Sequence, residues 1–249
     1  MPKAVIFDLD GTLAVSKQPL LEDMAELLGQ LTTRTPVAIT SGGGLPQLEK
    51  QVASRLPKSA MMSNLYLLPV SGAALYEWRG NSWNRVYEER LSDDEAQAIA
   101  EAMREVAERT GIINFSKQAY GERIEFRGAQ VSMSALGQQA PVIEKKMWDP
   151  NHEKRKTLQS QISELLPDYT VRYGGSTTID VTKRGIDKAY GIHKLCDRLA
   201  IQESDALYVG DELGPGGNDE VVFKTHIETR SVANPEETKE LIKELLIAA

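Results

Sequence analysis

A short apolar segment that ends in two aspartates constrains the fold of this chain most. Residues 4–13 read AVIFDLDGTL, and residues 5–7 form a continuous apolar run. Such a run is typical of a strand in a parallel sheet that is covered on both faces. Because side chains alternate along a strand, Asp8 and Asp10 are expected to point toward the same place. Ligands of open α/β sheets bind at the carboxyl ends of strands, so the pair predicts a site for a hard cation and a phosphate group.

Composition argues against several functional classes. The chain has 249 residues and a formal net charge of -7. This charge argues against a general nucleic-acid or anionic-membrane surface, because nothing would offset the repulsion from phosphate. The single cysteine, Cys196, rules out an internal disulfide, and its apolar neighbours indicate a core residue. We find neither a signal segment nor an apolar run of about 18 residues, and therefore expect a soluble cytoplasmic protein without a membrane partner.

The order of predicted elements divides the chain into two parts. Strands and helices alternate in the N-terminal part and again toward the C-terminus, which predicts a parallel sheet covered by helices. Between these parts the pattern reads helix, two strands, helix, two strands, which is typical of an antiparallel sheet covered on one face. We therefore expect an α/β domain formed by residues 1–82 and 184–249, with an α+β domain inserted at residues 83–183.

Three further polar clusters occur where predicted strands end or a predicted helix begins. Ser41 and the three glycines at 42–44 offer a hydroxyl and free backbone amides to a phosphate, although such segments are more often simple turns. Lys188 falls in the first turn of a helix, where a cation opposes the helix dipole; taken alone, it is most simply a surface lysine. Asp211 ends a buried strand shortly before the Asn-Asp pair at 218–219. Acids at two strand ends suit Mg²⁺, which needs few protein ligands.

Taken in order, these clusters resemble the signature of the haloacid dehalogenase superfamily of phosphotransferases. The ordered set is Asp-x-Asp-Gly-Thr at 8–12, Ser41, Lys188, Gly-Asp at 210–211 and Asn-Asp at 218–219. The resemblance implies a Rossmann-like core with a parallel sheet and a class IIB cap as the inserted domain. Several segments are also similar to eukaryotic-type phosphomannomutase: GERIEFRG at 121–128, SMSALG at 132–137, GG at 174–175, IDV at 179–181 and PGGND at 215–219.

The resemblance implies a role for each core residue. Asp8 would attack phosphorus and form an aspartyl phosphate, while Asp10 would donate and accept the proton. Mg²⁺ would be held by Asp8, the backbone carbonyl of Asp10 and Asp211. The other core residues would serve the phosphoryl group or its partners: Ser41, Gly42 and Lys188 would bind phosphoryl oxygens, and Asn218 and Asp219 would orient Lys188 or metal-bound water.

The cap would select the substrate. The resemblance places four cap residues at the substrate: Arg127, which would grip the distal phosphate of a sugar, and Thr178, Asp180 and Lys145. The pattern departs from the family elsewhere, since Gln138, Lys17, and Lys145 or Lys146 stand where the family has arginines. Lysine keeps the charge but loses the bidentate fork, and glutamine loses both. Arg127 also alternates with apolar residues, as the solvated face of an antiparallel strand does.

These observations predict a Mg²⁺-dependent phosphohydrolase that acts on a phosphorylated sugar, or a similar small metabolite, through an aspartyl phosphate. A weakened distal clamp would let a bisphosphate intermediate escape to water. This favours hydrolysis over the alternative of a phosphomannomutase that interconverts mannose 1-phosphate and mannose 6-phosphate. A non-catalytic sugar-phosphate-binding protein is a third hypothesis, which a nucleophile beside an acid/base disfavours. The expected partner is a small phosphorylated substrate, and the resemblance implies a homodimer through the cap as one arrangement of the chain.

Overall fold

The computed structural model describes residues 1–247, and the chain divides into two compact units. The first unit contains Met1–Glu88 and the segment from Asp187 onward, and the second contains Glu89–Ile186. The predicted division, at 82/83 and 183/184, lies a few residues before each of these junctions. Among residues 1–247, no helix combines the length and the apolar content that crossing a membrane would require.

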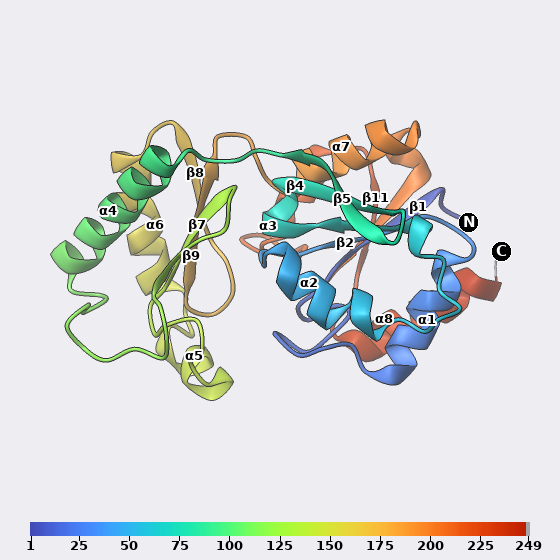
Figure 1. Ribbon diagram of the computed structural model, residues 1–249. Helices are drawn as coiled ribbons and strands as arrows, with labels where there is room; N and C mark the ends of the chain where they lie inside the picture. The colour runs from blue at the N-terminus through green and yellow to red at the C-terminus, as the bar shows by residue number, and fades with distance from the viewer. Residues whose placement is uncertain (248–249) are drawn as a thin grey trace. The chain divides into compact units, whose positions relative to one another are not determined.

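The first unit is built on a seven-stranded sheet (Figure 1). The strand order is β11-β10-β1-β2-β3-β4-β5, and neighbours from β11 to β3 run parallel. The bounds of the parallel strands are β1 Ala4–Asp8, β2 Val37–Thr40, β3 Leu65–Leu68, β10 Ala206–Gly210 and β11 Glu228–Ser231. Because β10, β1 and β2 are adjacent and parallel, their carboxyl ends meet at one edge of the sheet.

A hairpin extends this sheet and shifts the first junction between the units. Strands β4 (Ala74–Arg79) and β5 (Ser82–Glu88) pair antiparallel. Gly80 and Asn81 form their turn with φ of 57° and 62°, the conformation favoured in two-residue hairpins. Residues 83–88, which we predicted in the inserted domain, therefore belong to the first unit.

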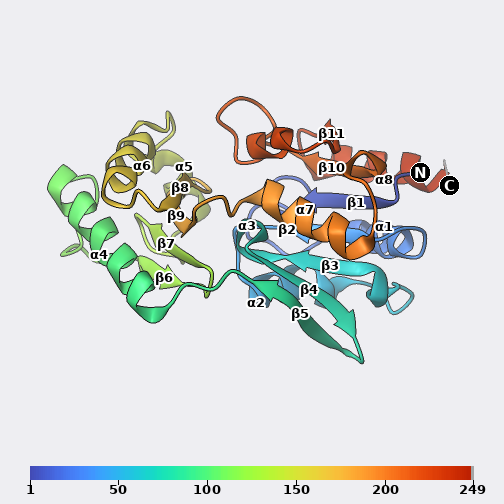
Figure 2. The same ribbon diagram turned by 90° about the horizontal axis from the view of Figure 1, so that it is seen from above.

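Helices cover both faces of the first sheet. Figures 1 and 2 show α7 (Lys188–Leu199) on one face and α1 (Glu22–Thr32), α2 (Leu45–Gln51) and α8 (Pro235–Ile247) on the other. Alternate residues of β1 join different apolar clusters, with Ile6 facing the α7 side and Phe7 the opposite side. Both faces of β1 are buried, as the continuous apolar run predicts. The shorter helical segments are α3 Pro69–Gly72 and the 3₁₀ turns Ala53–Arg55, Met62–Asn64, Glu203–Asp205 and Glu220–Lys224.

The second unit contains an antiparallel sheet in the order β6-β7-β9-β8. Its strands are β6 Ile124–Phe126, β7 Gln130–Ser134, β8 Tyr169–Tyr173 and β9 Thr178–Lys183. Helices α4 (Asp93–Thr110) and α6 (Glu153–Leu165) lie side by side on one face of this sheet (Figures 1 and 2). A capping box from Ser92 and Glu95 starts α4, and Gly111 in the left-handed conformation ends it.

One helix of the second unit does not follow from the hydrophobic pattern. In α5 (Val142–Trp148), Ile143 and Met147 are 73% and 74% exposed, whereas Lys145 is buried. This distribution reverses the usual one, in which apolar side chains face the core. Hydrophobic periodicity in the sequence therefore does not predict α5.

A buried ion pair connects α5 to α6 and the β8–β9 loop. Arg155 and Asp149 are buried, and Arg155 Nε lies 2.9 Å from Asp149 Oδ2. Arg155 also donates to the carbonyls of Gly174 and Gly175. Burial opposes ionisation of Asp149, but the hydrogen bonds from Arg155 outweigh it and lower the pKa of that carboxyl. The guanidinium therefore holds three segments of the second unit together.

We expect Arg155→Met to destabilise the second unit by about 3–5 kcal/mol, because it leaves a buried carboxylate without its partner. Calorimetry of the full chain should show a transition lowered by roughly 10 °C or more. Arg109→Met is the matched control in the same unit, since the Arg109–Glu105 pair is exposed and such pairs contribute less than about 1 kcal/mol. Equal shifts of the unfolding temperature in the two variants would contradict a stabilising role for the buried Arg155–Asp149 pair.

Candidate functional site

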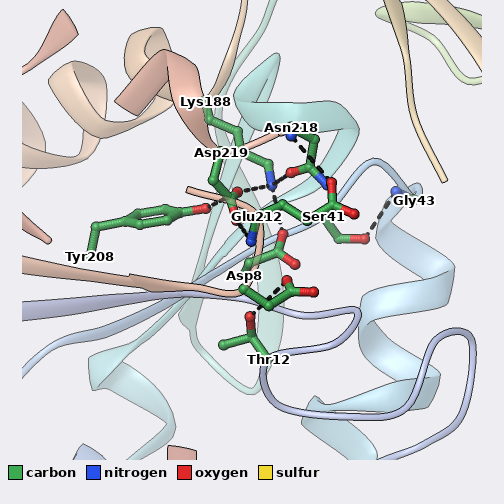
Figure 3. Close-up of polar contacts among 10 residues, drawn as sticks. Asp8, Thr12, Ser41, Gly43, Lys188, Tyr208, Glu212, Asn218 and Asp219 are labelled. Atoms are coloured by element: carbon green, nitrogen blue, oxygen red, sulfur yellow. Dashed lines mark hydrogen bonds and ion pairs between the residues drawn. The ribbon is translucent and has the colours of Figure 1, made fainter. Parts of the chain in front are cut away.

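Polar residues gather where three neighbouring strands of the first unit end. Asp8 is the last residue of β1, Asp211 directly follows β10 and Ser41 directly follows β2. Asp8 and Ser41 are buried, with exposed fractions of 3% and 2%. The topology thus brings together residues far apart in the sequence, and Figure 3 shows Asp8 and Ser41 beside Lys188.

Lys188 is the centre of the hydrogen-bond network in this site. It is the first residue of α7, and helix side chains tilt toward the N-terminus, so its chain reaches back toward the strand ends. Its Nζ lies 2.7 Å from Asp8 Oδ1 and 2.5 Å from Asp219 Oδ1, and it also donates to Asn218 Oδ1 (Figure 3). The three hydrogens of the ammonium therefore have three oxygen acceptors, two of which belong to carboxyl groups.

Three carboxylates in this site form a candidate metal centre. Oxygens of Asp8, Asp211 and Asp219 lie within 4.8 Å of one another. Asp219 already accepts from several donors, whereas Thr12 donates to Asp211 at 3.2 Å. A Cβ at Gly11 would lie 2.2 Å from Asp211 Oδ2, so glycine leaves the space that this carboxylate occupies. Hard oxygen donors in this number fit Mg²⁺, which retains water ligands.

Burial shifts the pKa values of these groups. Burial raises the pKa of Asp8 from 3.8 to about 8, with Lys188 opposing the shift and Asp219 adding to it. Burial also raises the pKa of Asp211 to about 6, with further contributions from Glu212 and Asp219. For Lys188, burial disfavours the charged form, but Asp219 and Asp8 outweigh it and raise the pKa. Of the three clustered acids only Asp8 and Asp219 contact the Lys188 ammonium, so ionisation of all three would leave excess negative charge that a divalent cation would neutralise.

Asp10 has a different environment from the three clustered acids. The backbone of Asp10 forms an isolated β-bridge with Ala14, and the Asp10 side-chain Oδ1 accepts the backbone N–H of Lys17 at 2.6 Å. Lys17 adopts a positive φ of 60° in this loop. The Asp10 carboxylate is therefore held by the loop that follows β1, while the acidic cluster contains Asp219, which we had predicted only as a supporting residue.

The loop after β2 is held by a strained turn. Ser41 Oγ accepts the N–H of Gly43, while the N–H groups of Val70 and Ser71 donate to the carbonyls of Gly43 and Ser41. Val70 and Ser71 have φ of 48° and 55°, in the left-handed region that β-branched residues rarely adopt. Beside this loop, the buried Thr40 Oγ1 has no hydrogen-bond partner within residues 1–247. Such an atom at the edge of the acidic cluster is consistent with a polar ligand.

Two further residues contact Asp219, and neither was a predicted site residue. Tyr208 donates its hydroxyl to Asp219 Oδ1 at 2.6 Å, and the backbone N–H of Glu212 donates to Oδ2 at 3.2 Å. A tyrosine in an otherwise apolar buried strand indicates a polar neighbour, because its hydroxyl needs a hydrogen-bond partner. The Glu212 side chain also accepts from Asn218, which fixes the loop that carries both predicted residues.

Of the predicted substrate-binding residues, Gly42 lies in the first unit, and the other four lie in the second unit and form two groups. In the first, Arg127 binds Glu125 at 2.7 Å and donates to Gln138 Oε1 at 3.3 Å, and Lys145 Nζ donates to the Gln138 carbonyl. In the second, Thr178 and Asp180 lie on one face of β9. Asp180 pairs across the sheet with Ser132 and Arg172.

Comparison with known proteins finds similarity to phosphomannomutases over nearly the whole chain. A family model described as eukaryotic phosphomannomutase matches residues 24–248. A probable phosphomannomutase from Caenorhabditis elegans is 26% identical, over 97% of this chain and 94% of its own length. A phosphomannomutase from Saccharomyces cerevisiae is 25% identical, over 97% of this chain and 93% of its own length.

Solved structures show the same fold at lower identity. An N-terminally truncated IMP-nucleotidase from Plasmodium falciparum has a TM-score of 0.72 and 18% identity, covering 98% of this chain and 70% of that chain. A trehalose-6-phosphate phosphatase related protein has a TM-score of 0.56 and 16% identity. The match covers 98% of this chain and 97% of that chain. The predicted fold class, a parallel-sheet core with an inserted α+β unit, is confirmed.

The raised pKa of Asp8 predicts a pH-dependent stability. Between about pH 4 and pH 8, folded Asp8 keeps a proton that the unfolded chain has released, so raising the pH across this window destabilises the folded metal-free protein. We expect the stability of Asp8→Asn relative to the wild type, both in EDTA, to increase as the pH rises from about 5 to about 8. A gain of about 1 kcal/mol would raise Tm by roughly 2–4 °C.

The control for this experiment is Asp23→Asn. A hydrogen bond from Lys239 lowers the pKa of Asp23, so its carboxyl is ionised throughout the window in both states. Its effect on Tm should therefore be the same at both pH values. An Asp8→Asn effect that is equally independent of pH would show that Asp8 does not titrate in this range.

Proposed function

Since this chain belongs to the eukaryotic phosphomannomutase family, we propose that it transfers the phosphoryl group of a phosphorylated sugar, or a similar small metabolite, to Asp8 and then mainly to water. The chain is an enzyme of the haloacid dehalogenase type, as predicted. The observation that carries the proposal is the buried contact of Asp8 with Lys188 inside a cluster of carboxylates. A binding protein would not need a nucleophile held in this way.

The core residues suit two successive transfers. In the first, an Asp8 oxygen forms a bond to phosphorus while the bond to the sugar oxygen breaks, which gives an aspartyl phosphate. In the second, water attacks phosphorus, releasing inorganic phosphate and restoring the Asp8 carboxylate. Asp10 lies two residues further along and would protonate the leaving oxygen, then take the proton from the attacking water.

Charge stabilisation would come from groups already placed around Asp8. Lys188 and the Ser41 hydroxyl would hold phosphoryl oxygens, and the backbone N–H of Gly42 would add a donor. Asp8, the carbonyl of Asp10 and Asp211 would hold Mg²⁺. When bound, this ion supplies the positive charge that lets one anion approach another. Asn218 and Asp219 would keep Lys188 directed at Asp8.

A specific observation in the second unit favours water as the acceptor. A mutase must retain a bisphosphorylated sugar while it turns over, and this needs strong binding of the distal phosphate. Gln138 stands where the family resemblance predicts an arginine, and Arg127 already binds Glu125. Fewer free positive charges weaken retention of the intermediate. The family match and full-length relatives named phosphomannomutase make mannose phosphate interconversion the second candidate.

Magnesium-dependent turnover of p-nitrophenyl phosphate tests phosphoryl transfer directly. We expect release of p-nitrophenol with Mg²⁺ and its loss with EDTA, because the carboxylates would repel the substrate without the cation. Asp8→Asn should lower kcat by about 1,000-fold or more, since it removes the nucleophile. Asp23→Asn, an exposed aspartate of the same unit, should retain wild-type turnover. Turnover that survives in Asp8→Asn would contradict the role of Asp8.

Acceptor choice is tested by replacing the altered residue of the second unit. With mannose 1-phosphate and a hexose bisphosphate, we expect the wild type to release mainly inorganic phosphate. Gln138→Arg should raise the ratio of mannose 6-phosphate to free phosphate by about tenfold, because a charge-assisted hydrogen bond contributes ~1.5–3 kcal/mol. Both products are measured in one coupled assay.

Gln139→Arg is the control for the added charge, since this neighbouring residue is exposed. It should leave the product ratio unchanged. Rapid formation of mannose 6-phosphate by the wild type, with little free phosphate, would replace hydrolase with mutase as the function.

A further inference from the structure

Tyr208 is a buried polar residue whose hydroxyl is not explained by the predicted motifs. It lies in β10, its exposed fraction is 0%, and its ring packs in the apolar cluster on the α7 side of the sheet. Phenylalanine would fill the same apolar space. The hydroxyl is therefore the feature that needs a reason, and Figure 3 shows it directed at Asp219 beside Lys188.

Gly210 allows this contact to form. Residues 208 and 210 lie on the same face of β10, because side chains alternate along a strand. A Cβ at Gly210 would lie 2.4 Å from Asp219 Oδ2 and 2.9 Å from Tyr208 Cε1. The absence of a side chain thus leaves the space in which the Tyr208 ring and the Asp219 carboxylate meet.

The Asp219 carboxylate is oriented by three donors. Its Oδ1 accepts from Tyr208 at 2.6 Å and from Lys188 at 2.5 Å, while Oδ2 accepts the backbone N–H of Glu212 at 3.2 Å. Tyr208 therefore donates to the same oxygen that holds Lys188. Burial raises the pKa of Tyr208 well above its ordinary value, so the hydroxyl remains a neutral donor.

We propose that Tyr208 is a positioning residue for phosphoryl transfer, whose hydroxyl fixes the Asp219 carboxylate so that this carboxylate holds Lys188 at Asp8. The inference rests on the proposed function, in which Asp8 attacks phosphorus and Lys188 binds phosphoryl oxygens. Tyr208 does not touch the reacting atoms. Without its hydroxyl, Asp219 rotates about its side-chain bonds and the ammonium moves away from the place where charge develops.

Tyr208→Phe tests this role because it removes one oxygen and keeps the ring. With p-nitrophenyl phosphate and Mg²⁺, we expect kcat to fall about 10- to 100-fold, as is usual when a group that orients a site residue is lost, with KM changed less than about threefold. In an Asp219→Asn background the same change should have little further effect, since residues of one network are not additive.

Tyr66→Phe is the matched control. Tyr66 packs against the same apolar cluster but lies on β3, which β2 and β1 separate from β10. We expect Tyr66→Phe to retain the kcat of the wild type. A wild-type kcat in Tyr208→Phe, or equal losses in the wild-type and Asp219→Asn backgrounds, would overturn the inference, because a purely structural tyrosine gives those results.

A pair of crystal structures separates this inference from the proposed function. If the wild type shows no Mg²⁺-dependent turnover, the proposed function fails, and the wild-type and Tyr208→Phe structures then decide the role of Tyr208. We expect a rotated Asp219 carboxylate and a Lys188 Nζ–Asp8 Oδ1 distance longer than the 2.7 Å seen here. Superimposable side chains of Asp8, Lys188 and Asp219 would overturn the inference whatever the activity.

Discussion

The ammonium of Lys188 is the interaction on which the candidate site depends. It sits at the N-terminus of α7, where the helix dipole disfavours a cation by about 0.3–1 kcal/mol. Two unit charges 4 Å apart attract each other by about 4 kcal/mol at an effective dielectric constant near 20. The contacts with Asp8 and Asp219 therefore outweigh the dipole, and the same contacts let two acids be buried side by side. The position is unfavourable for a helix but suits the phosphate-binding role that we propose for Lys188.

The strand order explains why this arrangement needs so few residues. Strands β10, β1 and β2 are neighbours, so Asp211, Asp8 and Ser41 come together without long loops. Glycines then supply space rather than flexibility, since Gly11 makes room for Asp211 and Gly210 makes room for Asp219. The acidic cluster and Lys188 lie in one unit of the chain, so the first unit alone assembles these contacts from strand ends, the start of α7 and the segment after β10.

The sequence predicted those parts of the molecule whose pattern reflects local physics. Apolar runs located β1, β2 and β10, and the residues at or directly after their ends, Asp8, Ser41 and Asp211, lie at one sheet edge. The hydrophobic pattern did not predict elements that depend on a short turn or that expose apolar side chains. The β4–β5 turn depends on two residues with positive φ, and α5 exposes Ile143 and Met147 to solvent. The hydroxyl of Tyr208 was not predicted because its role depends on Asp219, which is distant in sequence and close only after folding.

The proposed reaction assigns different tasks to the two units, because their charged residues would contact different parts of the substrate. In the proposed reaction, the core would contact the transferred phosphoryl group in the same way whether the acceptor is water or a sugar hydroxyl, so Asp8 and Lys188 would not distinguish hydrolase from mutase. That difference would lie in how long a bisphosphorylated intermediate is retained, which would depend on positive charge in the second unit. There Arg127 is already paired with Glu125, and its other neighbour, Gln138, is neutral. A single paired arginine would grip a dianion less firmly than two free ones, and this is why we propose water as the main acceptor.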